Sequence, residues 1–201
     1  MRYGMVISLK RCIGCNSCTI ACKHENGTGP GVFWRKVNIT ESGIYPAASM
    51  HSLPILCNHC ENAPCAKVCP VNATMIDDNG IVFIDEKKCI GCRYCMTACP
   101  YNVRSYVTSN DQGYFEQGLT PYEKVAYQKH TVGTVEKCTF CSQRLDEEGG
   151  IPACVLTCPA KALFFGDLDD PEGPLVKLLA DNPNYRTLLP DAGTQPKVFY
   201  I

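Results

Sequence analysis

The cysteines of this chain fall into four groups of four, and this grouping constrains the fold more than any other feature of the sequence. All 16 cysteines of the 201 residues belong to a group. Two groups share the spacing C-x2-C-x2-C-x3-C, and the others are spaced C-x2-C-x4-C-x3-C and C-x2-C-x12-C-x3-C. In chain order the groups are Cys12, Cys15, Cys18 and Cys22; Cys57, Cys60, Cys65 and Cys69; Cys89, Cys92, Cys95 and Cys99; and Cys138, Cys141, Cys154 and Cys158. The chain therefore has to fold around whatever these thiols bind.

The spacing is typical of ligands for cubane iron–sulfur clusters. The run C-x2-C-x2-C-x3-C followed by proline is the ligand pattern of bacterial [4Fe–4S] ferredoxins, in which the last cysteine binds the other cluster of a pair. Three of the four groups end in Cys-Pro, at Pro70, Pro100 and Pro159. Proline there fixes φ and removes an N–H that could compete for the wrong sulfur. The pattern therefore predicts [4Fe–4S] clusters held by paired groups.

Two other uses of cysteine fit this spacing less well. Structural zinc sites are usually built from two C-x2-C pairs separated by a linker, and only the group from Cys138 to Cys158 approaches that pattern. Disulfides are disfavoured because a C-x2-C-x2-C run brings three thiols together with no simple pairing. A zinc-stapled interaction protein, and a mixed protein with zinc only at the fourth group, remain as alternatives.

Charge and hydropathy exclude two further classes of protein. Nineteen Lys and Arg residues balance 20 Asp and Glu residues, for a formal net charge of −1, and they form no basic tract. A nucleic-acid partner is therefore not expected, because it would require a row of cations facing phosphates. Apolar runs such as Gly80–Ile84 are about five residues long, whereas a membrane span needs roughly 20. We therefore expect no transmembrane segment in this chain.

Strand-like segments flank the cysteine groups and predict an α+β fold. They are Tyr3–Leu9, His51–Leu56, Gly80–Asp85 and Ala162–Gly166. Residues 74–84 read as a hairpin with Asn79-Gly80 at its tip. Because a hairpin between two cysteine runs is the ferredoxin plan, residues 50–107 are predicted to form an inner two-cluster module. The first and fourth groups then pair as an outer module of residues 1–49 and 108–201, in which the inner one is nested.

The segments outside the cysteine groups are predicted to be long loops, partner-binding surface and an extended C-terminal tail. Thr120-Pro121-Tyr122-Glu123 combines capping-box spacing with proline at the first helical position, which predicts a short helix. The tail from Asp167 is rich in proline and ends in the apolar stretch Pro196–Ile201, which we expect to be packed rather than free in solvent.

No arrangement of side chains in the sequence predicts catalysis. The histidines are scattered, and His59, between two cysteines, is expected to be an ordinary packed or hydrogen-bonded residue rather than one that tunes a cluster. Several cations lie close to the cysteine groups, where positive charge raises a cluster's reduction potential by favouring the extra electron. Solvated surface charge is an equally good interpretation for each of them. These cations are Lys10, Arg11, Lys87, Lys88, Arg93 and Lys137.

Further motifs accompany the cysteines. They are Cys57-Asn58-His59-Cys60, Ala63-Pro64-Cys65, Glu136-Lys137-Cys138-Thr139-Phe140-Cys141, Gly166-Asp167-Leu168-Asp169-Asp170-Pro171 and the Val198–Ile201 end. Together with the order of the groups, they resemble the four-cluster subunit of dimethyl-sulfoxide-reductase-type molybdoenzymes over nearly the whole chain. The resemblance implies a non-catalytic subunit that relays electrons between a large molybdopterin-containing catalytic subunit and a membrane anchor or soluble carrier. A formate dehydrogenase or hydrogenase subunit and a free-standing polyferredoxin remain alternatives.

The resemblance also implies which cysteines share a cluster. Cluster one takes Cys12, Cys15, Cys18 and Cys158; cluster two Cys22, Cys138, Cys141 and Cys154; cluster three Cys57, Cys60, Cys65 and Cys99; and cluster four Cys69, Cys89, Cys92 and Cys95. The first pair of clusters is expected to lie toward the catalytic subunit and the second toward the other electron partner. Some relatives replace a cysteine of the third group, usually by tryptophan, and hold a [3Fe–4S] cluster. Cys92 fills that position here, so four [4Fe–4S] clusters are predicted.

The N-terminal residues bear on where the clusters are inserted. Met1–Lys10 contains only a short apolar stretch, and no small-residue cleavage site precedes Cys12. We therefore expect the chain to meet its metal in the cytoplasm. Two final locations stay open: the cytoplasm, or the membrane periphery after export in folded form with a partner that carries a twin-arginine signal.

Overall fold

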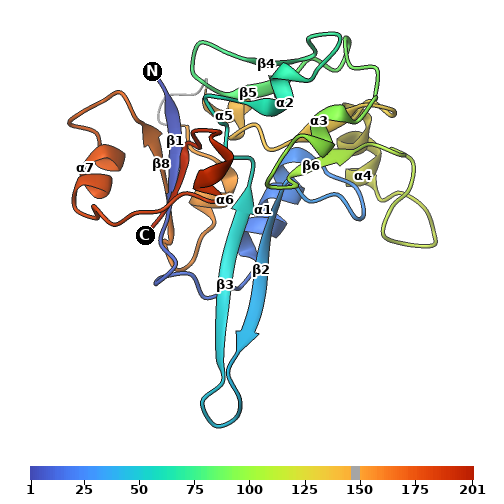
Figure 1. The fold of residues 1–201 in the computed structure, drawn as a ribbon. Helices are drawn as coiled ribbons and strands as arrows, with labels where there is room; N and C mark the ends of the chain where they lie inside the picture. The colour runs from blue at the N-terminus through green and yellow to red at the C-terminus, as the bar shows by residue number, and fades with distance from the viewer. Residues whose placement is uncertain (146–149) are drawn as a thin grey trace.

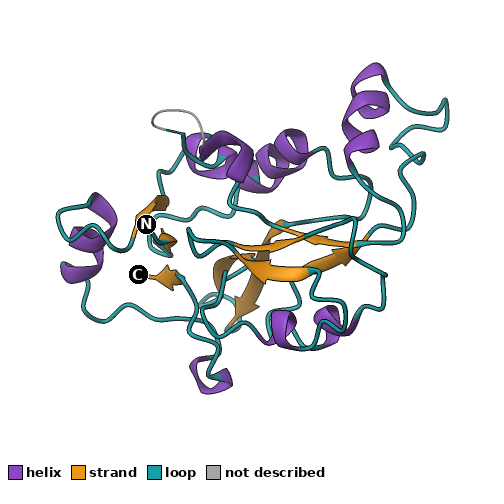
Figure 2. Ribbon diagram, turned by 90° about the horizontal axis from the view of Figure 1, so that it is seen from above, coloured by secondary structure: helices purple, strands orange, loops and turns teal. Residues whose placement is uncertain are grey.

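The structure is a computed structural model that describes residues 1–145 and 150–201. Within these ranges the strands form one three-stranded sheet and three two-stranded sheets, and the helices are short. Figure 2 shows strands in the middle of that view and helices around them. This mixture agrees with the α+β class predicted from the sequence. No helix in the described part of the chain is long and apolar enough to cross a membrane.

The two ends of the chain meet in the three-stranded sheet. Its central strand is β1 (Tyr3–Ile7), with β8 (Leu163–Asp167) antiparallel on one side and β9 (Val198–Tyr200) parallel on the other. Met5 lies at the centre of β1 and is fully buried. Helix α7 (Pro174–Ala180) packs against β1 and β8. The sheet thus joins the segment before the first cysteine group to the segment after the fourth (Figure 1).

The proline-rich tail packs onto the body of the molecule, as predicted. Besides β9, it contains the 3-10 turn η2 (Pro190–Ala192), and Arg186 forms a bridge with Tyr200. The Tyr200 hydroxyl donates to the Pro54 carbonyl at 2.9 Å. The last residues therefore tie the terminal sheet to the segment that enters the second cysteine group.

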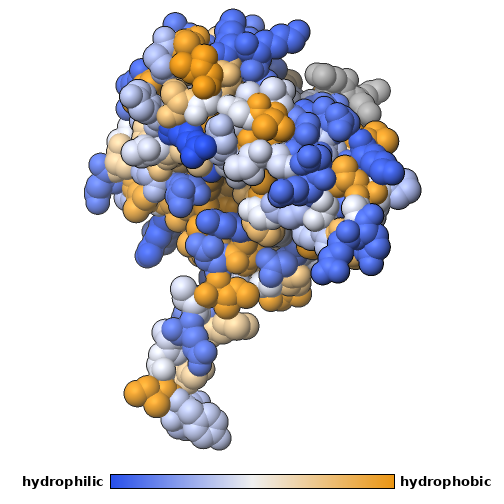
Figure 3. Space-filling view, turned by 90° about the vertical axis from the view of Figure 1, so that its right-hand side faces the viewer, coloured by the Kyte–Doolittle hydropathy of each residue, from blue (hydrophilic) through white to orange (hydrophobic). Residues whose placement is uncertain are grey.

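A long hairpin projects from the body (Figures 1 and 3). It consists of β2 (Arg35–Ser42) and β3 (Ser49–Leu56), paired antiparallel from Arg35↔Leu56 at the base to Ser42↔Ser49 near the tip. The strand predicted at His51–Leu56 is present within β3. The base of the hairpin is buried, whereas Ile44 and Tyr45 in its loop are 84% and 91% exposed.

Two smaller sheets lie between the cysteine groups. β4 (Thr74–Ile76) and β5 (Val82–Ile84) form the hairpin predicted for this segment. Its loop is longer than a two-residue turn, since β4 ends at Ile76 and β5 begins at Val82. Within the loop, Asp77 Oδ1 accepts hydrogen bonds from the N–H groups of Asn79 and Ile81. β6 (Arg104–Tyr106) pairs with β7 (Val135–Lys137), and β7 also lies beside β5.

Most helices begin inside a cysteine group. They are α1 (Ser17–Asn26), α2 (Pro64–Lys67), α3 (Tyr94–Thr97), α5 (Ser142–Leu145) and α6 (Ala153–Leu156). In all except α5, the third cysteine of a group lies in the first turn, and the fourth follows four residues later on the same side. The spacing x3 between these cysteines thus corresponds to one helical turn.

The helix predicted at Thr120 is present as α4 (Pro121–Ala126), followed by the 3-10 turn η1 (Tyr127–Lys129). The Thr120 hydroxyl accepts from the Glu123 N–H at 3.3 Å, and the Glu123 carboxylate accepts from the Thr120 N–H at 2.7 Å. Both halves of the predicted capping box are therefore formed.

Candidate metal centres

The first and third cysteine groups form loops with the same backbone geometry. Gly14 and Gly91 have φ values of 69° and 67°, and Asn16 and Arg93 have φ values of 60° and 63°. These residues occupy matching positions within C-x2-C-x2-C. Left-handed residues in such a turn can direct neighbouring N–H groups toward one concave side, which is an anion-binding arrangement. The two loops are therefore shaped to surround a negatively charged group.

The three Cys-Pro sequences also end in matching turns. Asn72, Asn102 and Lys161 each lie three residues after the last cysteine of a group and have φ values of 51°, 49° and 45°. In two of these turns the next N–H donates to the cysteine sulfur: Ala73 N lies 3.1 Å from Cys69 Sγ, and Ala162 N lies 3.3 Å from Cys158 Sγ. Hydrogen bonds to sulfur are one of the means by which a protein adjusts a cluster's potential.

Cysteines from the first and fourth groups meet in the core. The thiols of Cys138, Cys22, Cys141 and Cys154 are all buried and lie close enough for their charges to act on one another. Burial, reinforced by Cys154 and Cys141, raises the pKa of the Cys22 thiol to about 12. These are the cysteines that the resemblance implies for cluster two.

A second meeting of thiols occurs between the second and third groups. Cys60 lies near Cys57, Cys65 and Cys99, and burial raises the pKa of its thiol to about 11. Burial also raises the pKa of the Cys65 thiol, which has Cys57 and Cys99 as neighbours. These are the cysteines implied for cluster three.

The remaining thiols form two sets nearer the surface. Those implied for cluster four line one cavity together with apolar side chains of β5 and β7; they are Cys69, Cys89, Cys92 and Cys95. Of those implied for cluster one, Cys12, Cys15 and Cys18 lie on one loop, and Cys158 follows α6, which packs against α1. Ser8 links the two segments, because it accepts from Cys12 N and donates its own N–H to the Ala162 carbonyl.

The donor sets fit a cubane cluster better than a single ion. Within residues 1–145 and 150–201, no group of three or more His, Cys, Asp or Glu side chains is close enough to hold one metal ion. A [4Fe–4S] cubane does not need such convergence, because each of its four irons takes one thiolate. Thiols that are neighbours without converging on one point, such as Cys69, Cys89, Cys92 and Cys95 around one cavity, suit that requirement.

Three cations are buried among these thiols. Arg35, Arg104 and Lys137 are only 1%, 5% and 2% exposed. The sequence drew attention to Lys137 but not to the two arginines. Arg35 lies far from any cysteine in the sequence, and no motif marks it as a metal-site residue. Arg104 begins the strand that follows the Cys-Pro turn of the third cysteine group. The other five cations near the cysteines are exposed, which agrees with the interpretation as surface charge; they are Lys10, Arg11, Lys87, Lys88 and Arg93.

His59 is a packed and hydrogen-bonded residue, as expected. Its ring is fully buried, stacks on Phe140 with centroids 3.8 Å apart, and accepts from the Val82 N–H at 3.1 Å through Nδ1. Burial, followed by the charge of Lys137, lowers the pKa of the imidazole well below its ordinary value. His59 is therefore neutral, with its remaining proton on Nε2.

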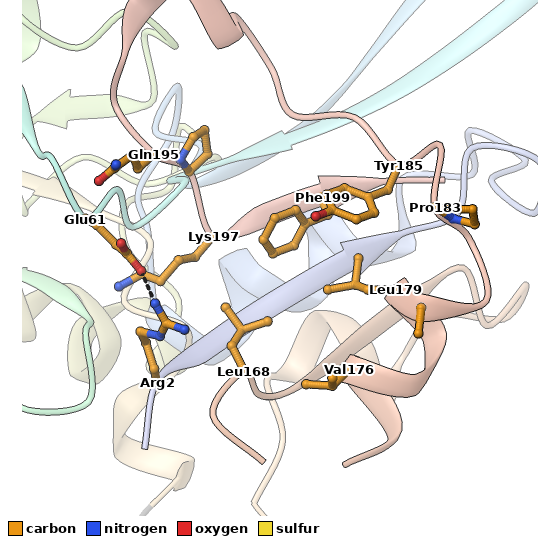
Figure 4. A pocket seen from close by; sticks show the side chains of 12 residues that line it. Arg2, Glu61, Leu168, Val176, Leu179, Pro183, Tyr185, Gln195, Lys197 and Phe199 are labelled. Carbon is orange, nitrogen blue, oxygen red and sulfur yellow. Dashed lines mark hydrogen bonds and ion pairs between the residues drawn. The ribbon is translucent and has the colours of Figure 1, made fainter. Parts of the chain in front are cut away.

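An open surface pocket lies between α7, the tail and Glu61 (Figure 4). It is bounded by apolar side chains of α7 and the tail, including Leu179 and Phe199, and by the 2.5 Å ion pair between Arg2 and Glu61. No cysteine lines it. It does not contribute to the thiol sets.

Comparison with known proteins agrees with this geometry. The model of the 4Fe-4S dicluster domain matches residues 48–117 and 110–168. A Halobacterium salinarum protein named as an iron-sulfur subunit of a dimethyl sulfoxide reductase is 47% identical over 99% of this chain and 78% of its own length. A subunit of the selenate reductase of Mesobacillus selenatarsenatis is 42% identical over 100% of this chain and 72% of its own length. The arsenate respiratory reductase iron-sulfur subunit of Shewanella sp. strain ANA-3 is 39% identical over 100% of this chain and 96% of its own length.

Proposed function

The chain belongs to the 4Fe-4S dicluster family, together with the iron–sulfur subunits of several reductases, and on that premise we propose that it is the electron-transfer subunit of a molybdopterin-dependent oxidoreductase. The observation that carries the proposal is that buried and half-buried thiols from different cysteine groups are neighbours: Cys22 lies near Cys141 and Cys154, and Cys60 lies near Cys99. When bound, four [4Fe–4S] clusters supply one-electron carriers along the chain. The chain itself holds the sulfurs, shields them and sets the charge around them.

The ligand sets of this proposal are the four that the family resemblance implies. The neighbouring thiols of Cys22, Cys138, Cys141 and Cys154 support cluster two, and those around Cys60 support cluster three. The shared cavity supports cluster four. Cluster one is supported by the packing of α1 against α6 and by the link through Ser8.

The same proposal includes two nested ferredoxin-like modules. The terminal sheet supports an outer module of residues 1–49 and 108–201, because β1 precedes the first cysteine group and β8 follows the fourth. The hairpin of β4 and β5 supports an inner module of residues 50–107. β6 and β7 pair across the boundary, which links the two modules, and assembly of the outer module is expected to depend on folding of the inner one.

The proposed partners follow from the relatives. Each is named as a subunit of a reductase for an oxyanion or sulfoxide, which supports a large molybdopterin-containing catalytic subunit as the first partner in an anaerobic respiratory complex. The second partner is a membrane anchor or a soluble electron carrier. The chain then works in the cytoplasm, or at the membrane periphery after folded export with a twin-arginine-bearing partner.

Iron analysis and co-purification test the proposal. An anaerobic preparation should contain about sixteen irons and a similar amount of acid-labile sulfide per chain. Isolation of the chain from its native host should bring down a large subunit that contains molybdenum or tungsten. A count near twelve or below would reject four cubanes, and zinc in place of iron would favour the interaction-protein alternative. Full iron without a metal-containing large subunit would identify a free-standing polyferredoxin, and formate-dependent or hydrogen-dependent reduction would identify the other enzyme classes.

A further inference from the structure

Three buried cations lack an acidic partner in the part of the chain that the structure describes. Arg35, Lys137 and Arg104 form no ion pair with a carboxylate among residues 1–145 and 150–201. Removing a charge from water is strongly unfavourable unless an opposite charge or good hydrogen bonds compensate it. In that part of the chain, the groups that lie around these three side chains are cysteine thiols instead.

Arg35 lies between the thiols proposed for clusters one and two. Its Nη1 is 3.6 Å from Cys154 Sγ and 3.4 Å from Met5 Sδ, while Nε and Nη2 are buried without a hydrogen-bond partner. The thiols that act on the pKa of its guanidinium are those of Cys154, Cys18 and Cys138. Cys18 belongs to the proposed set of cluster one, and the other two belong to that of cluster two. The guanidinium thus faces both sets with donors left over.

Lys137 lies between the thiols proposed for clusters two and three. Its ammonium group donates to the carbonyls of Val82 and Cys138. The thiols that face it are Cys57, Cys138 and Cys65. Two of these are proposed ligands of cluster three and one is a proposed ligand of cluster two.

Arg104 occupies the corresponding place between clusters three and four. Its Nη1 donates to Thr74 Oγ1 at 3.4 Å, and its Nη2 is buried without a partner. The thiols that face it are Cys65, Cys57 and Cys95. The first two are proposed ligands of cluster three, and Cys95 is a proposed ligand of cluster four.

The strand register brings two of these cations together. Arg104 lies directly opposite Lys137 in the ladder of β6 and β7. Like charges at directly opposed positions destabilise a sheet, and burial strengthens their repulsion because the surrounding dielectric is low. A [4Fe–4S] cubane with four thiolates carries a net negative charge of about −2 when oxidised, and more when reduced. Such charges on both sides would compensate the pair.

Because each of these cations lies between the thiols of two proposed clusters, we propose that Arg35, Lys137 and Arg104 form a series of buried cations, one at each junction between successive clusters. Each cation stabilises the added electron on its two flanking clusters and screens the repulsion between those clusters when both are reduced. This inference rests on the proposed function and its ligand sets. The three residues act on the clusters through their positive charge and take no direct part in a reaction.

The test is a redox titration of the anaerobically purified holo-chain, followed by EPR, in neutral variants of each cation. Arg35→Met, Lys137→Met and Arg104→Met are each expected to lower two of the four potentials. The shift for each should correspond to about a tenfold or larger change in the one-electron equilibrium, which is about 59 mV. The affected pairs are predicted to differ: Arg35→Met and Arg104→Met shift disjoint pairs, and Lys137→Met shifts one potential from each pair.

Two controls separate charge from packing. Lys177→Met removes an exposed cation of α7, whose ammonium group pairs with the Glu172 carboxylate at 2.8 Å; it should leave all four potentials unchanged. Arg35→Lys and Arg104→Lys keep the charge, so they should keep the potentials close to those of the unmodified chain. Iron content is measured for every variant.

The outcomes are distinguishable. Unshifted potentials in iron-replete methionine variants, or the same pair shifted by Arg35→Met and Arg104→Met, would overturn the inference. If the methionine variants lose iron, retention of iron by the lysine variants supports a requirement for charge, whereas loss in both overturns it in favour of packing. Fewer than four clusters in the unmodified chain would instead count against the proposed function itself.

Discussion

His130 is a buried titratable residue that connects three segments of the chain. Its Nδ1 lies 2.5 Å from Glu136 Oε2, and its Nε2 lies 2.9 Å from the Asn26 carbonyl oxygen. Burial lowers the pKa of the imidazole, but the hydrogen bond and charge of Glu136, together with the Asn26 carbonyl, outweigh burial and raise it above the ordinary value. His130 is therefore protonated over a wider pH range in the folded chain than in the unfolded one.

This raised pKa predicts a pH-dependent stability. A raised folded-state pKa stabilises the fold fully below the unfolded pKa of about 6.5, and the contribution is lost as pH rises through the folded value. His130→Gln should remove it, so the difference in melting temperature between the unmodified chain and the variant should shrink as the pH rises above about 6.5. His51→Gln, at an exposed histidine, is the matched control. A difference that stays constant with pH would contradict the prediction.

Gly91 tests the shape of the cysteine loops. Its φ is 67°, and a Cβ added there would clash with the Gly133 carbonyl oxygen. Gly31 is the matched control, because its φ is 74° but a Cβ would meet nothing within 4 Å. Gly91→Ala should destabilise the fold by about 1–3 kcal/mol more than Gly31→Ala, from overpacking added to the shared backbone strain. Thermal unfolding and iron analysis measure the effect, and equal loss in both variants would show that φ alone matters.

At the scale of single residues, the sequence indicated the candidate metal-binding cysteines but not the cations buried among them. Cysteine spacing is a local property, so the four groups could be recognised without coordinates, and the family resemblance implied which cysteines share a cluster. The buried cations could not, because Arg35 approaches Cys154 only when the base of the hairpin packs on α6, and that contact joins residues far apart in the chain. Proximity in sequence selected Lys87 and Arg93 instead, and both are exposed.

Among the elements, α4 shows how a local signal determines a local structure. Thr120 caps the helix with its hydroxyl, and Glu123 completes the box. Thr120→Ala should destabilise the fold by about 1 kcal/mol, which corresponds to a fall in melting temperature of about 2–4 °C for a chain of this size. Thr108→Ala, at an exposed threonine for which the structure gives no side-chain hydrogen bond, should leave it unchanged. An equal fall in both variants would remove the cap as the cause.

The projecting hairpin of β2 and β3 could be predicted only in part from local sequence patterns. The sequence predicted its second strand from the apolar residues that lead to Cys57, but not β2. A strand pair that stands in solvent buries little of either face, so it leaves only a weak hydrophobic pattern. The predicted hairpin of β4 and β5 lies closer to the core, where Val82 is almost fully buried. The burial of one face gives this hairpin apolar residues that, together with Asn79-Gly80 at its tip, allow it to be predicted from the sequence.

For the whole molecule, the chain ends and the metal sites are expected to depend on each other. β9 pairs with β1, the Met5 N–H donates to the Lys197 carbonyl at 2.9 Å, and the Lys197 ammonium donates to the Gly80 carbonyl. Lys197 therefore links the terminal sheet to the hairpin between the second and third cysteine groups. The α+β class could be predicted from the sequence. The parallel place of β9 beside β1 could not, because strand order depends on contacts between the two ends of the chain.

Removal of residues 197–201 tests this dependence. The truncated chain loses β9, the Lys197 contacts and the hydrogen bond from Tyr200 to Pro54, so β1 is left with an uncovered edge beside the first cysteine group. Binding of metal and folding are coupled in such proteins. We therefore expect iron to fall from about sixteen to about eight per chain, with loss of the two clusters of the outer module and retention of the inner pair.

The control is Tyr200→Phe, which removes the 2.9 Å hydrogen bond to the Pro54 carbonyl and keeps the strand. A single hydrogen bond contributes about 0.5–1.5 kcal/mol, so this variant should retain all its iron and melt slightly earlier. Full iron in the truncated chain would show that the outer module holds its clusters without the terminal strand. Loss of all the iron would show that the inner module cannot hold its pair alone. The two modules, which the β6–β7 ladder joins, would then form a single cooperative unit.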